Sequence, residues 1–319
     1  MRAFARYAWA VVGYHLAVVA WGAFVRVTGS GAGCGRSWPT CNGEVIPRSP
    51  EVRTAIEFVH RVTSAIAVGL VAVLVVWAVR SFPRGHAARR AAWSAGAFLV
   101  AEALIGAALV LFGWVAGDVS AARGWAVAIH LANTFLLLAS LALAATFAEA
   151  EPRPLSISGR GPLAAILLLA LAAAVMAGAT GAIAALGDTL YPALSFAEGL
   201  ERETSTGASV LLRLRVLHPF AALGSAIASL AFARVALRSR PEPRVRTWTV
   251  AVVALVAVEV SAGVLNLALL APAWLQILHL LLADVTWLAL VLLSAATLAT
   301  ARRGEPAEPA RPLGVVAGR

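Results

Sequence analysis

Long apolar runs separated by short polar segments dominate the pattern of this chain. Eight runs reach the roughly 20 residues that a helix needs to cross the hydrocarbon core of a bilayer. They cover residues 7–27, 55–79, 91–114, 124–148, 161–186, 210–233, 247–270 and 274–300. Periodicity does not separate helix from strand in uniformly apolar runs, but their length favours helices. We therefore expect an all-α integral membrane protein with eight transmembrane helices.

The composition agrees with a membrane location. Of the 319 residues, 61% are hydrophobic and only 13% are charged, whereas soluble domains carry about 25% charged residues. The first run follows Arg2 and Arg6, as the apolar part of a signal peptide would. It is long for that role and lacks a clear small-x-small cleavage site, so we expect it to be retained as a span.

The arginines predict the orientation of the chain. With a cytoplasmic N-terminus, 17 of the 26 basic residues fall on the cytoplasmic side, as the positive-inside rule requires. We therefore expect a multi-pass protein of the cell membrane with both termini in the cytoplasm. The net charge of +10 then reflects topology and affinity for anionic lipid. No nucleic-acid partner is expected.

The chain has two cysteines, Cys34 and Cys41, in the polar segment GCGRSWPTCN after the first run. In the predicted orientation this segment lies outside the cytoplasmic membrane, where disulfides persist. We expect a disulfide bond between them. The alternatives are two free thiols or a zinc site, although a spacing of six intervening residues is unlike the CxxC pairs typical of zinc sites.

The sequence also suggests an internal repeat. The segment AEALIGAALVL around Glu102 matches VEVSAGVLNLALL around Glu259. Because four spans return a chain to its starting side, two such halves would be related by an axis along the membrane normal. The predicted architecture is two pseudo-symmetric four-helix bundles, with a short cytoplasmic tail at the C-terminus. The bundles would comprise residues 1–150 and 151–319, with the segment 151–162 as the boundary.

Four histidines form the pattern that indicates chemistry. Each occurs five to eight residues into a run that enters from outside: His60, His130, His218 and His279. At 1.5 Å per residue, all four lie about 8–12 Å below the outer surface. A single histidine in a membrane commonly bonds a neighbouring helix, but four at one depth favour two facing pairs of metal ligands, each holding a heme iron. No CxxCH motif is present, so the heme would be held non-covalently.

Charged residues stand one turn before two of these histidines. Arg215 precedes His218, and together with Arg213 we expect it to pair with heme propionates. Anchoring at the membrane surface is the alternative for both arginines. Glu57 takes the equivalent place before His60, where a carboxylate would orient the ligand or transfer a proton. The alternative for Glu57 is an interaction with the helix dipole.

Three further carboxylates lie within the apolar runs. Glu102 and Glu259 occupy matched positions, and we expect them to form structural hydrogen bonds between helices. Asp284, five residues after His279, has no assigned role. Ionisable groups inside a membrane are candidates for function by default, and this applies to all three.

Several segments resemble those of the heme A synthase family. They are VRVTGSGAGCGRSWPTCNG, IEFVHR, AIHLANTFLLLASLAL, VLHPFAAL and GVLNLALLAPAWLQILHLLLADVTWLALVLL. The resemblance covers nearly the whole chain and includes all four histidines. It implies eight helices in two pseudo-symmetric bundles. It also implies oxidation of the methyl group of heme O to the formyl group of heme A by successive hydroxylations.

The resemblance assigns a role to each half. The expected catalytic residues, in the N-terminal half that holds the substrate heme O, are Glu57, His60 and His130. The expected ligands of a permanent heme b, in the C-terminal half, are His218 and His279.

The resemblance extends to the loop and the partners. Cys34 and Cys41 match the paired cysteines of bacterial members of the family. The implied partners are heme O, membrane lipid, an electron donor that the sequence does not identify and, as a candidate, the heme O synthase.

Other activities make different predictions. A di-heme cytochrome b that only transfers electrons across the membrane would hold its hemes at two depths, whereas these histidines share one. A transporter would have polar residues through the bilayer and broken helices at its midplane, and neither is clear here. A prenyltransferase that makes heme O would need an Asp-rich diphosphate motif, and the sequence has none.

Overall fold

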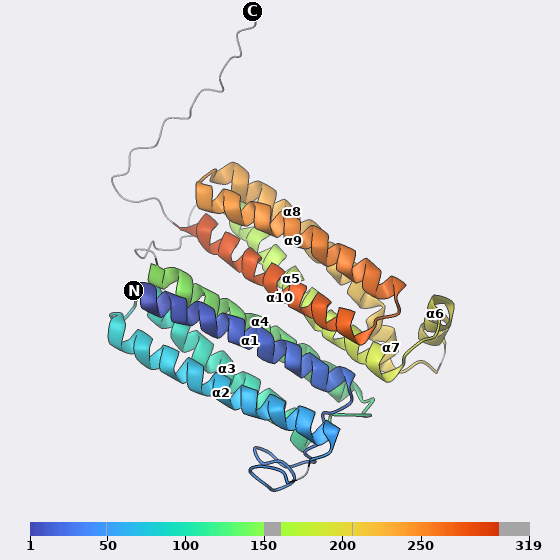
Figure 1. Cartoon of the computed structure of the whole chain (residues 1–319). Coiled ribbons are helices and arrows are strands. Elements are labelled where there is room, and N and C mark those ends of the chain that lie inside the picture. Colours follow the sequence, from blue (N-terminus) through green and yellow to red (C-terminus); the bar gives the residue numbers. More distant parts are fainter. Residues whose placement is uncertain (49, 150–160, 206, 300–319) are drawn as a thin grey trace, which may run out of the picture.

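The computed structural model describes residues 1–48, 50–149, 161–205 and 207–299 (Figure 1). In this part of the chain, eight helical spans are long and apolar enough to cross a membrane. The predicted all-α class with eight transmembrane helices is therefore confirmed. Most of the predicted boundary segment and the tail from residue 300 lie outside the described residues. The helices are α1 (Arg2–Val27), α2 (Val52–Ser81), α3 (Ala87–Leu111), α4 (Ala121–Glu149), α5 (Gly161–Leu190), α6 (Phe196–Thr204), α7 (Val210–Arg215), α8 (Leu217–Ser239), α9 (Pro243–Ala268) and α10 (Ala273–Leu298).

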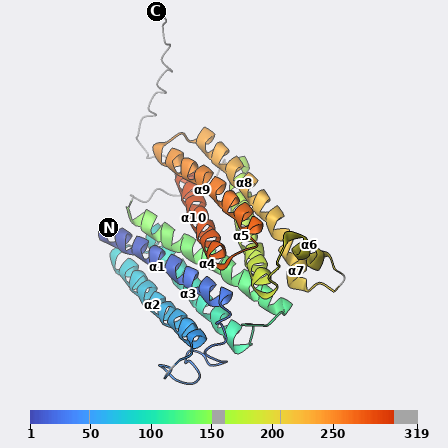
Figure 2. The same cartoon turned by 45° about the vertical axis from the view of Figure 1, so that its right-hand side comes forward.

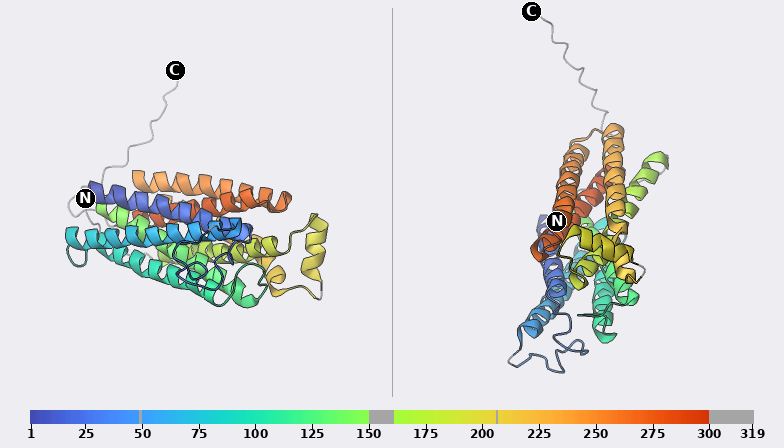
Figure 3. Two further views of the ribbon diagram at one scale, coloured as in Figure 1. Left: turned by 60° about the horizontal axis from the view of Figure 1, so that its bottom comes forward. Right: turned by 90° about the vertical axis from the view of Figure 1, so that its right-hand side faces the viewer.

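The long helices run side by side in two groups (Figures 1 and 2). Helices α1 to α4 pack together, as do α5, α8, α9 and α10; we call these the N-terminal and C-terminal helices. The groups meet where α4 contacts α5 and α10, and where α1 contacts α10. The loop of residues 28–48, α6 and the start of α10 lie at one end, which we call the disulfide-loop end (Figure 1; further views in Figure 3). A symmetry axis relating the groups, and the division into two domains, stay predictions.

Each group of helices has its own apolar core. The N-terminal helices bury Phe4, Leu74 and Leu138, and the C-terminal helices bury Phe232 and Leu290. Many of the other buried residues in the N-terminal core are alanines, which let the helices approach closely. This packing leaves the opposite faces of the same helices turned outward.

The outward faces are themselves apolar. Leu104, Phe220 and Val264 are 61%, 72% and 65% exposed. In water this surface would be unfavourable, since large exposed apolar patches are rare on soluble proteins. In a bilayer the lipid tails solvate these side chains, so the exposed faces agree with eight membrane-crossing spans.

Buried polar contacts join the two groups. Trp287 of α10 donates a hydrogen bond from Nε1 to the backbone carbonyl of Phe135 in α4 at 2.6 Å, and the two rings stack with centroids 5.2 Å apart. Nearer the disulfide-loop end, Arg26 of α1 donates to the carbonyl of Ala185 in α5 at 2.5 Å. Its guanidinium also donates to Oε1 of Gln276 in α10 at 3.1 Å. These contacts position α1 and α4 against α5 and α10.

The sixth span differs from the continuous helix that the sequence predicts. It is divided into α7 and α8 at Val216, two residues before His218. Pro219 has no backbone N–H to donate to the carbonyl of Arg215, four residues earlier, and its ring crowds that turn. The helix is therefore interrupted beside a candidate ligand.

Helix α6 was not predicted. It is short and polar, and it lies between α5 and α7, in the interval between the predicted spans 161–186 and 210–233. Its N-terminus is capped by Ser195, whose hydroxyl accepts the backbone N–H of Glu198 at 3.2 Å. A cap of this kind satisfies one of the free N–H groups of a first turn.

Candidate functional site

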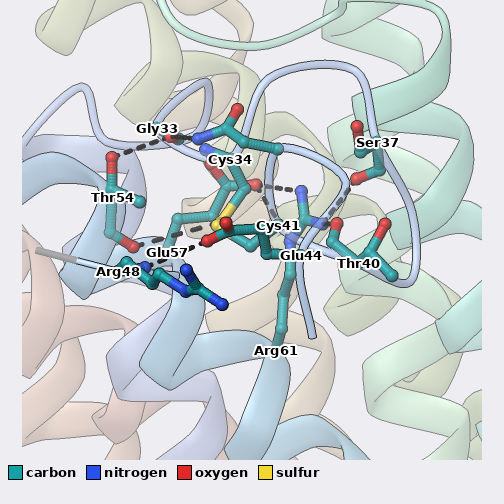
Figure 4. The surroundings of a disulfide bond; sticks show 11 residues. Gly33, Cys34, Ser37, Thr40, Cys41, Glu44, Arg48, Thr54, Glu57 and Arg61 are labelled. Carbon is teal, nitrogen blue, oxygen red and sulfur yellow. Dashed lines mark hydrogen bonds and ion pairs between the residues drawn. A yellow bond between two sulfur atoms is a disulfide. The ribbon is translucent and has the colours of Figure 1, made fainter. Parts of the chain in front are cut away.

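A disulfide-closed loop covers the start of α2. Cys34 and Cys41 form a disulfide, as predicted, and both are buried (Figure 4). Glu57 of α2 accepts the backbone N–H of Cys34 through Oε2 at 2.8 Å. Arg61, one turn further along α2, donates to the backbone carbonyls of Ser37 and Thr40 at 2.5 and 2.6 Å. The loop is thus held on α2 by side chains on either side of His60.

Glu57 and Arg61 also bond each other. The guanidinium of Arg61 lies 2.5 Å from Oε1 of Glu57, and Glu57 is only 3% exposed. Both carboxylate oxygens of Glu57 therefore have protein partners in this structure, which the sequence did not indicate. A catalytic role for Glu57 stays a prediction. Its observed contacts fix the loop at the end of the helix that carries His60.

The four predicted histidines lie near one end of the helices. Each falls six to nine residues after the first residue of its span, at the disulfide-loop end. All four side chains are partly exposed rather than buried. The rings belong to α2 and α4 in the N-terminal helices, and to α8 and α10 in the C-terminal helices.

Each of these imidazole rings faces a glycine on the preceding span. The pairs are Gly22 with His60, Gly106 with His130, Gly181 with His218, and Gly263 with His279. A β-carbon at Gly22 or Gly181 would lie only 3.0 or 2.9 Å from the Cε1 atom of the facing ring. The distance at Gly263 would be 3.2 Å, and at Gly106 it would be 4.0 Å to the ring nitrogen Nε2. The missing side chains therefore make room for the rings, most tightly at three of the four positions.

The two rings in the C-terminal helices lie close together. The centroids of His218 and His279 are 6.3 Å apart. With metal–imidazole bonds of about 2.0–2.1 Å, two rings that share one metal ion have centroids roughly 6 Å apart. The His218–His279 pair has this spacing. His218 and His279 thus fit the two ligands of one heme iron.

The buried nitrogens of the rings support the same fit. Among the described residues, Nδ1 of His60, His130 and His279 is buried without a hydrogen bond, whereas Nε2 of none of the four histidines is in this class. Buried polar atoms are normally paired. Nε2 is not among the buried unpaired atoms in any of the four rings. This nitrogen is therefore the one suited to bind an external ligand.

Carboxylates stand beside two of the histidines. Oε1 of Glu102 is 3.3 Å from Nδ1 of His130, and Oε1 of Glu259 is 3.2 Å from Nδ1 of His279. Glu102 also accepts a hydrogen bond from Nδ2 of Asn133 in α4, so the expected bond between helices is present there. The expectation of a purely structural role was incomplete, because it missed the contact with the histidines. The spacing offered a signal, since each Glu stands one turn before a glycine that faces a histidine.

Arg215 is engaged by two carboxylates that are distant from it in the sequence. Its Nε donates to Oε1 of Glu203 at 2.6 Å, and one terminal nitrogen donates to Oδ1 of Asp188 at 2.6 Å. A heme propionate would have to share the guanidinium with these groups. Arg213 is exposed at the same helix end. Pairing of either arginine with propionates stays a prediction.

The comparisons with known proteins identify the family. A sequence model named COX15-CtaA and described as "Cytochrome oxidase assembly protein" matches residues 5–291. The chain belongs to the COX15-CtaA family. The resemblance to heme A synthases is confirmed, and with eight apolar spans this family member is a multi-pass membrane protein.

The proteins that resemble this chain carry two different names. A protein of Thermus thermophilus named "Protoheme IX farnesyltransferase" is 48% identical over 294 residues, which are 92% of this chain and 48% of that protein. "Heme A synthase" of Alkalihalophilus pseudofirmus is 39% identical over 98 residues, 31% of this chain and 33% of the relative. "Heme A synthase" of Halalkalibacterium halodurans is 35% identical over 134 residues, 42% of each chain. The chain thus spans about half the length of the Thermus relative and matches smaller parts of the others.

Proposed function

We propose that this protein is a heme A synthase, which oxidises the methyl group of heme O to the formyl group of heme A. Substrate heme O would bind between His60 and His130, and a permanent heme b between His218 and His279. The observation that carries the proposal is the facing pair of imidazoles 6.3 Å apart in the C-terminal helices. Family membership and the matched histidines of the N-terminal helices support it.

The side chains of the N-terminal helices bind and orient the substrate in this proposal. Heme b, when bound, supplies the redox chemistry that carries electrons to or from the substrate site. His60 and His130 fix the position of the macrocycle, so that one methyl group is presented for reaction. Each of two hydroxylations converts one C–H bond of the methyl carbon into a C–OH bond, which is a two-electron oxidation. With dioxygen as the oxidant, two electrons and two protons reduce its second oxygen atom to water; with water as the oxygen source, two electrons and two protons leave to an acceptor. The resulting geminal diol loses water to give the aldehyde. The electron donor is not identified.

The disulfide loop would cover the edge of the substrate site. Glu57 and Arg61 hold the loop against α2 on either side of His60. With the loop outside the cytoplasmic membrane and both termini in the cytoplasm, the site opens at the outer side of the cell membrane. Glu57 would then lie beside the substrate, where it can orient His60 or exchange a proton with the reacting group.

Supply of the substrate suggests a partner enzyme. Heme O carries a farnesyl-derived tail, and the Thermus relatives that match this chain over about half their length are named protoheme IX farnesyltransferases. We propose that an enzyme of that class delivers heme O to this protein. Because the tail is apolar, delivery through the lipid between two membrane proteins would avoid its exposure to water.

Pigment analysis tests the proposed activity. The chain is expressed in a host that supplies heme O and lacks its own heme A synthase, and the hemes are extracted and separated. We expect heme A, recognised by its formyl group, in cells that express the chain and none in cells with an empty vector. If the purified protein carries only heme b and heme O stays unchanged, the protein is a di-heme cytochrome and the proposal is wrong. A protein without any heme would favour the transporter alternative.

Substitution of the glycine that faces His60 should disturb heme binding by displacing the imidazole ring. In Gly22→Ala, the new methyl group lies 3.0 Å from Cε1 of His60, so the imidazole has to move. We expect the yield of heme A to fall at least several-fold. Gly13→Ala on the same helix is the matched control, because no atom lies within 4 Å of its β-carbon. Alanine there removes a helix penalty of about 1 kcal/mol, so heme A yield should be unchanged and thermal stability equal or higher.

A further inference from the structure

The two members of each histidine pair have different surroundings. His130 and His279 each face a carboxylate at 3.2–3.3 Å from Nδ1. Nδ1 of His218 instead lies 3.4 Å from the hydroxyl of Thr180. Nδ1 of His60 has no hydrogen-bond partner in the described part of the chain. Each pair thus combines one histidine beside a carboxylate with one histidine that lacks it.

The two carboxylates also differ from each other. Glu102 accepts hydrogen bonds from Asn133 Nδ2 and Thr134 Oγ1, both at 2.5 Å. Glu259 has no such donors around it in the described residues, and its Oε2 atom is buried without a hydrogen bond. The negative charge of Glu102 is therefore shared among several donors. The polar contact of Glu259 in the described residues is with His279, and the buried carboxylate of Asp284 lies near both glutamates.

A carboxylate on the far nitrogen of a ligating imidazole has known consequences. The nitrogen that binds a metal is set by the hydrogen bond that the other nitrogen makes. Such a partner fixes the tautomer and the angle of the ring and raises the basicity of the ligand. The two nitrogen–oxygen distances here are already within hydrogen-bonding reach, so only the angle of each ring has to change. A carboxylate with fewer competing donors polarises its imidazole more strongly.

We propose that Glu102 and Glu259 are positioning residues that make His130 and His279 the firmly held ligand of each heme pair. Glu259 acts more strongly than Glu102, because His279 is its main partner. His60, without a partner on Nδ1, is the ligand that detaches when product leaves the N-terminal site. This inference rests on the proposed function, since it assumes that the four histidines bind heme.

The different surroundings of the histidines fit the different requirements of a permanent heme and a substrate heme. A permanent heme needs two stable ligands, and in the C-terminal pair both rings have a polar neighbour on Nδ1. A substrate heme has to arrive and leave, so one weak ligand favours turnover. In the N-terminal pair, His130 shares the carboxylate of Glu102 with other donors, and His60 has no carboxylate on Nδ1. His60 is therefore the weak ligand.

The test uses the full-length protein with heme b bound at the C-terminal pair. His60→Ala serves as the background, so that the remaining bis-histidine site is His218 with His279. In Glu259→Gln the volume is kept and the charge is removed. We expect the reduction potential of the heme to rise, the low-spin signature of the ferric heme to shift, and transfer of heme to apomyoglobin to accelerate about 10-fold or more. Ser261→Ala, an exposed hydroxyl on the same helix that bonds its own backbone, is the matched control and should change none of these.

A substitution beside the N-terminal pair should have the opposite effect and slow the release of heme. In Thr134→Val, Glu102 loses one competing donor and can bond His130 more fully. Release of heme from the N-terminal site, measured in the same transfer assay with His60 present, should become slower. This variant keeps the inference open to refutation if Glu259→Gln does not fold.

The possible outcomes distinguish failure of the proposed function from failure of the role proposed for Glu102 and Glu259. A wild-type protein that binds no heme would overturn the proposed function and this inference with it. A wild-type protein that binds heme, while Glu259→Gln keeps the same potential, spectrum and transfer rate, would overturn only this inference. A fall in thermal stability without a change in potential would show a purely structural ion pair, which also contradicts the inference.

Discussion

Replacing His218 with alanine should leave the purified protein without heme at the C-terminal site and without heme A formation. The ring of His218 lies 6.3 Å from that of His279, so its removal leaves the iron with a single imidazole from this pair. Loss of even an outer-shell partner of a metal ligand costs about 10–100-fold in affinity or activity, and loss of a ligand should exceed that. The measurement is the heme content per protein, from the pyridine hemochrome spectrum, together with extracted heme A.

The matched substitution at the other pair should separate the two sites. His60→Ala should retain heme b but lower heme A formation by about 100-fold or more, if the N-terminal pair holds the substrate. His86→Asn is the control, because His86 lies outside both pairs and caps α3 through Nδ1, a role that asparagine also fills. Unchanged heme A formation in His60→Ala would exclude the N-terminal pair as the reaction site. Full heme content in His218→Ala would exclude the C-terminal pair as the heme b site.

Replacing Glu57 with alanine should release the disulfide loop from α2. The substitution removes the acceptor of the Cys34 N–H and leaves Arg61, whose side chain is only 11% exposed, without its carboxylate. Breaking a buried ion pair by removing one partner costs about 3–5 kcal/mol. We expect rapid cleavage within residues 35–48 by a protease that leaves the wild-type loop intact, and a lower temperature of thermal unfolding.

Two variants make the loop experiment specific. Glu51→Ala is the matched control, since Glu51 is an exposed acid at the start of the same helix and makes no side-chain cap bond. Glu57→Gln should keep the loop partly attached, because an amide oxygen can still accept the Cys34 N–H. If Glu57→Gln keeps the loop protected and yet abolishes heme A formation, Glu57 has the predicted role in the reaction as well. Equal protease resistance of Glu57→Ala and wild type would contradict the role of Glu57 in holding the loop.

The sequence predicted the spans well and their ends less well. Apolar runs of about 20 residues have few alternatives to a membrane helix, so each of the eight predicted spans has a helical counterpart. The ends are set by caps and local bonds that hydropathy does not reveal, and the second span therefore runs over Val52–Ser81 instead of 55–79. The interruption before His218 was visible in principle, because Pro219 cannot continue the hydrogen bonds of the preceding turn.

The candidate site was predictable in its ligands but not in their surroundings. Counting along the runs placed the four histidines at one depth, since helical rise is uniform. Contacts between helices depend on how each helix is rotated, and one sequence does not fix that rotation in uniformly apolar runs. For this reason the glycine that faces each ring and the approach of Glu259 to His279 required the structure. The bond of Arg26 to Gln276, 250 residues away, is likewise a property of the packed helices.

The positions of the iron atoms would show whether each histidine pair binds a heme. Crystals of the purified protein, grown with heme b and heme O bound, would be measured above and below the iron absorption edge to give an anomalous difference map. We expect one iron between the Nε2 atoms of His218 and His279 and a second between those of His60 and His130. Iron bound to other side chains, or a heme lying outside both histidine pairs, would show that these histidines do not form the heme sites.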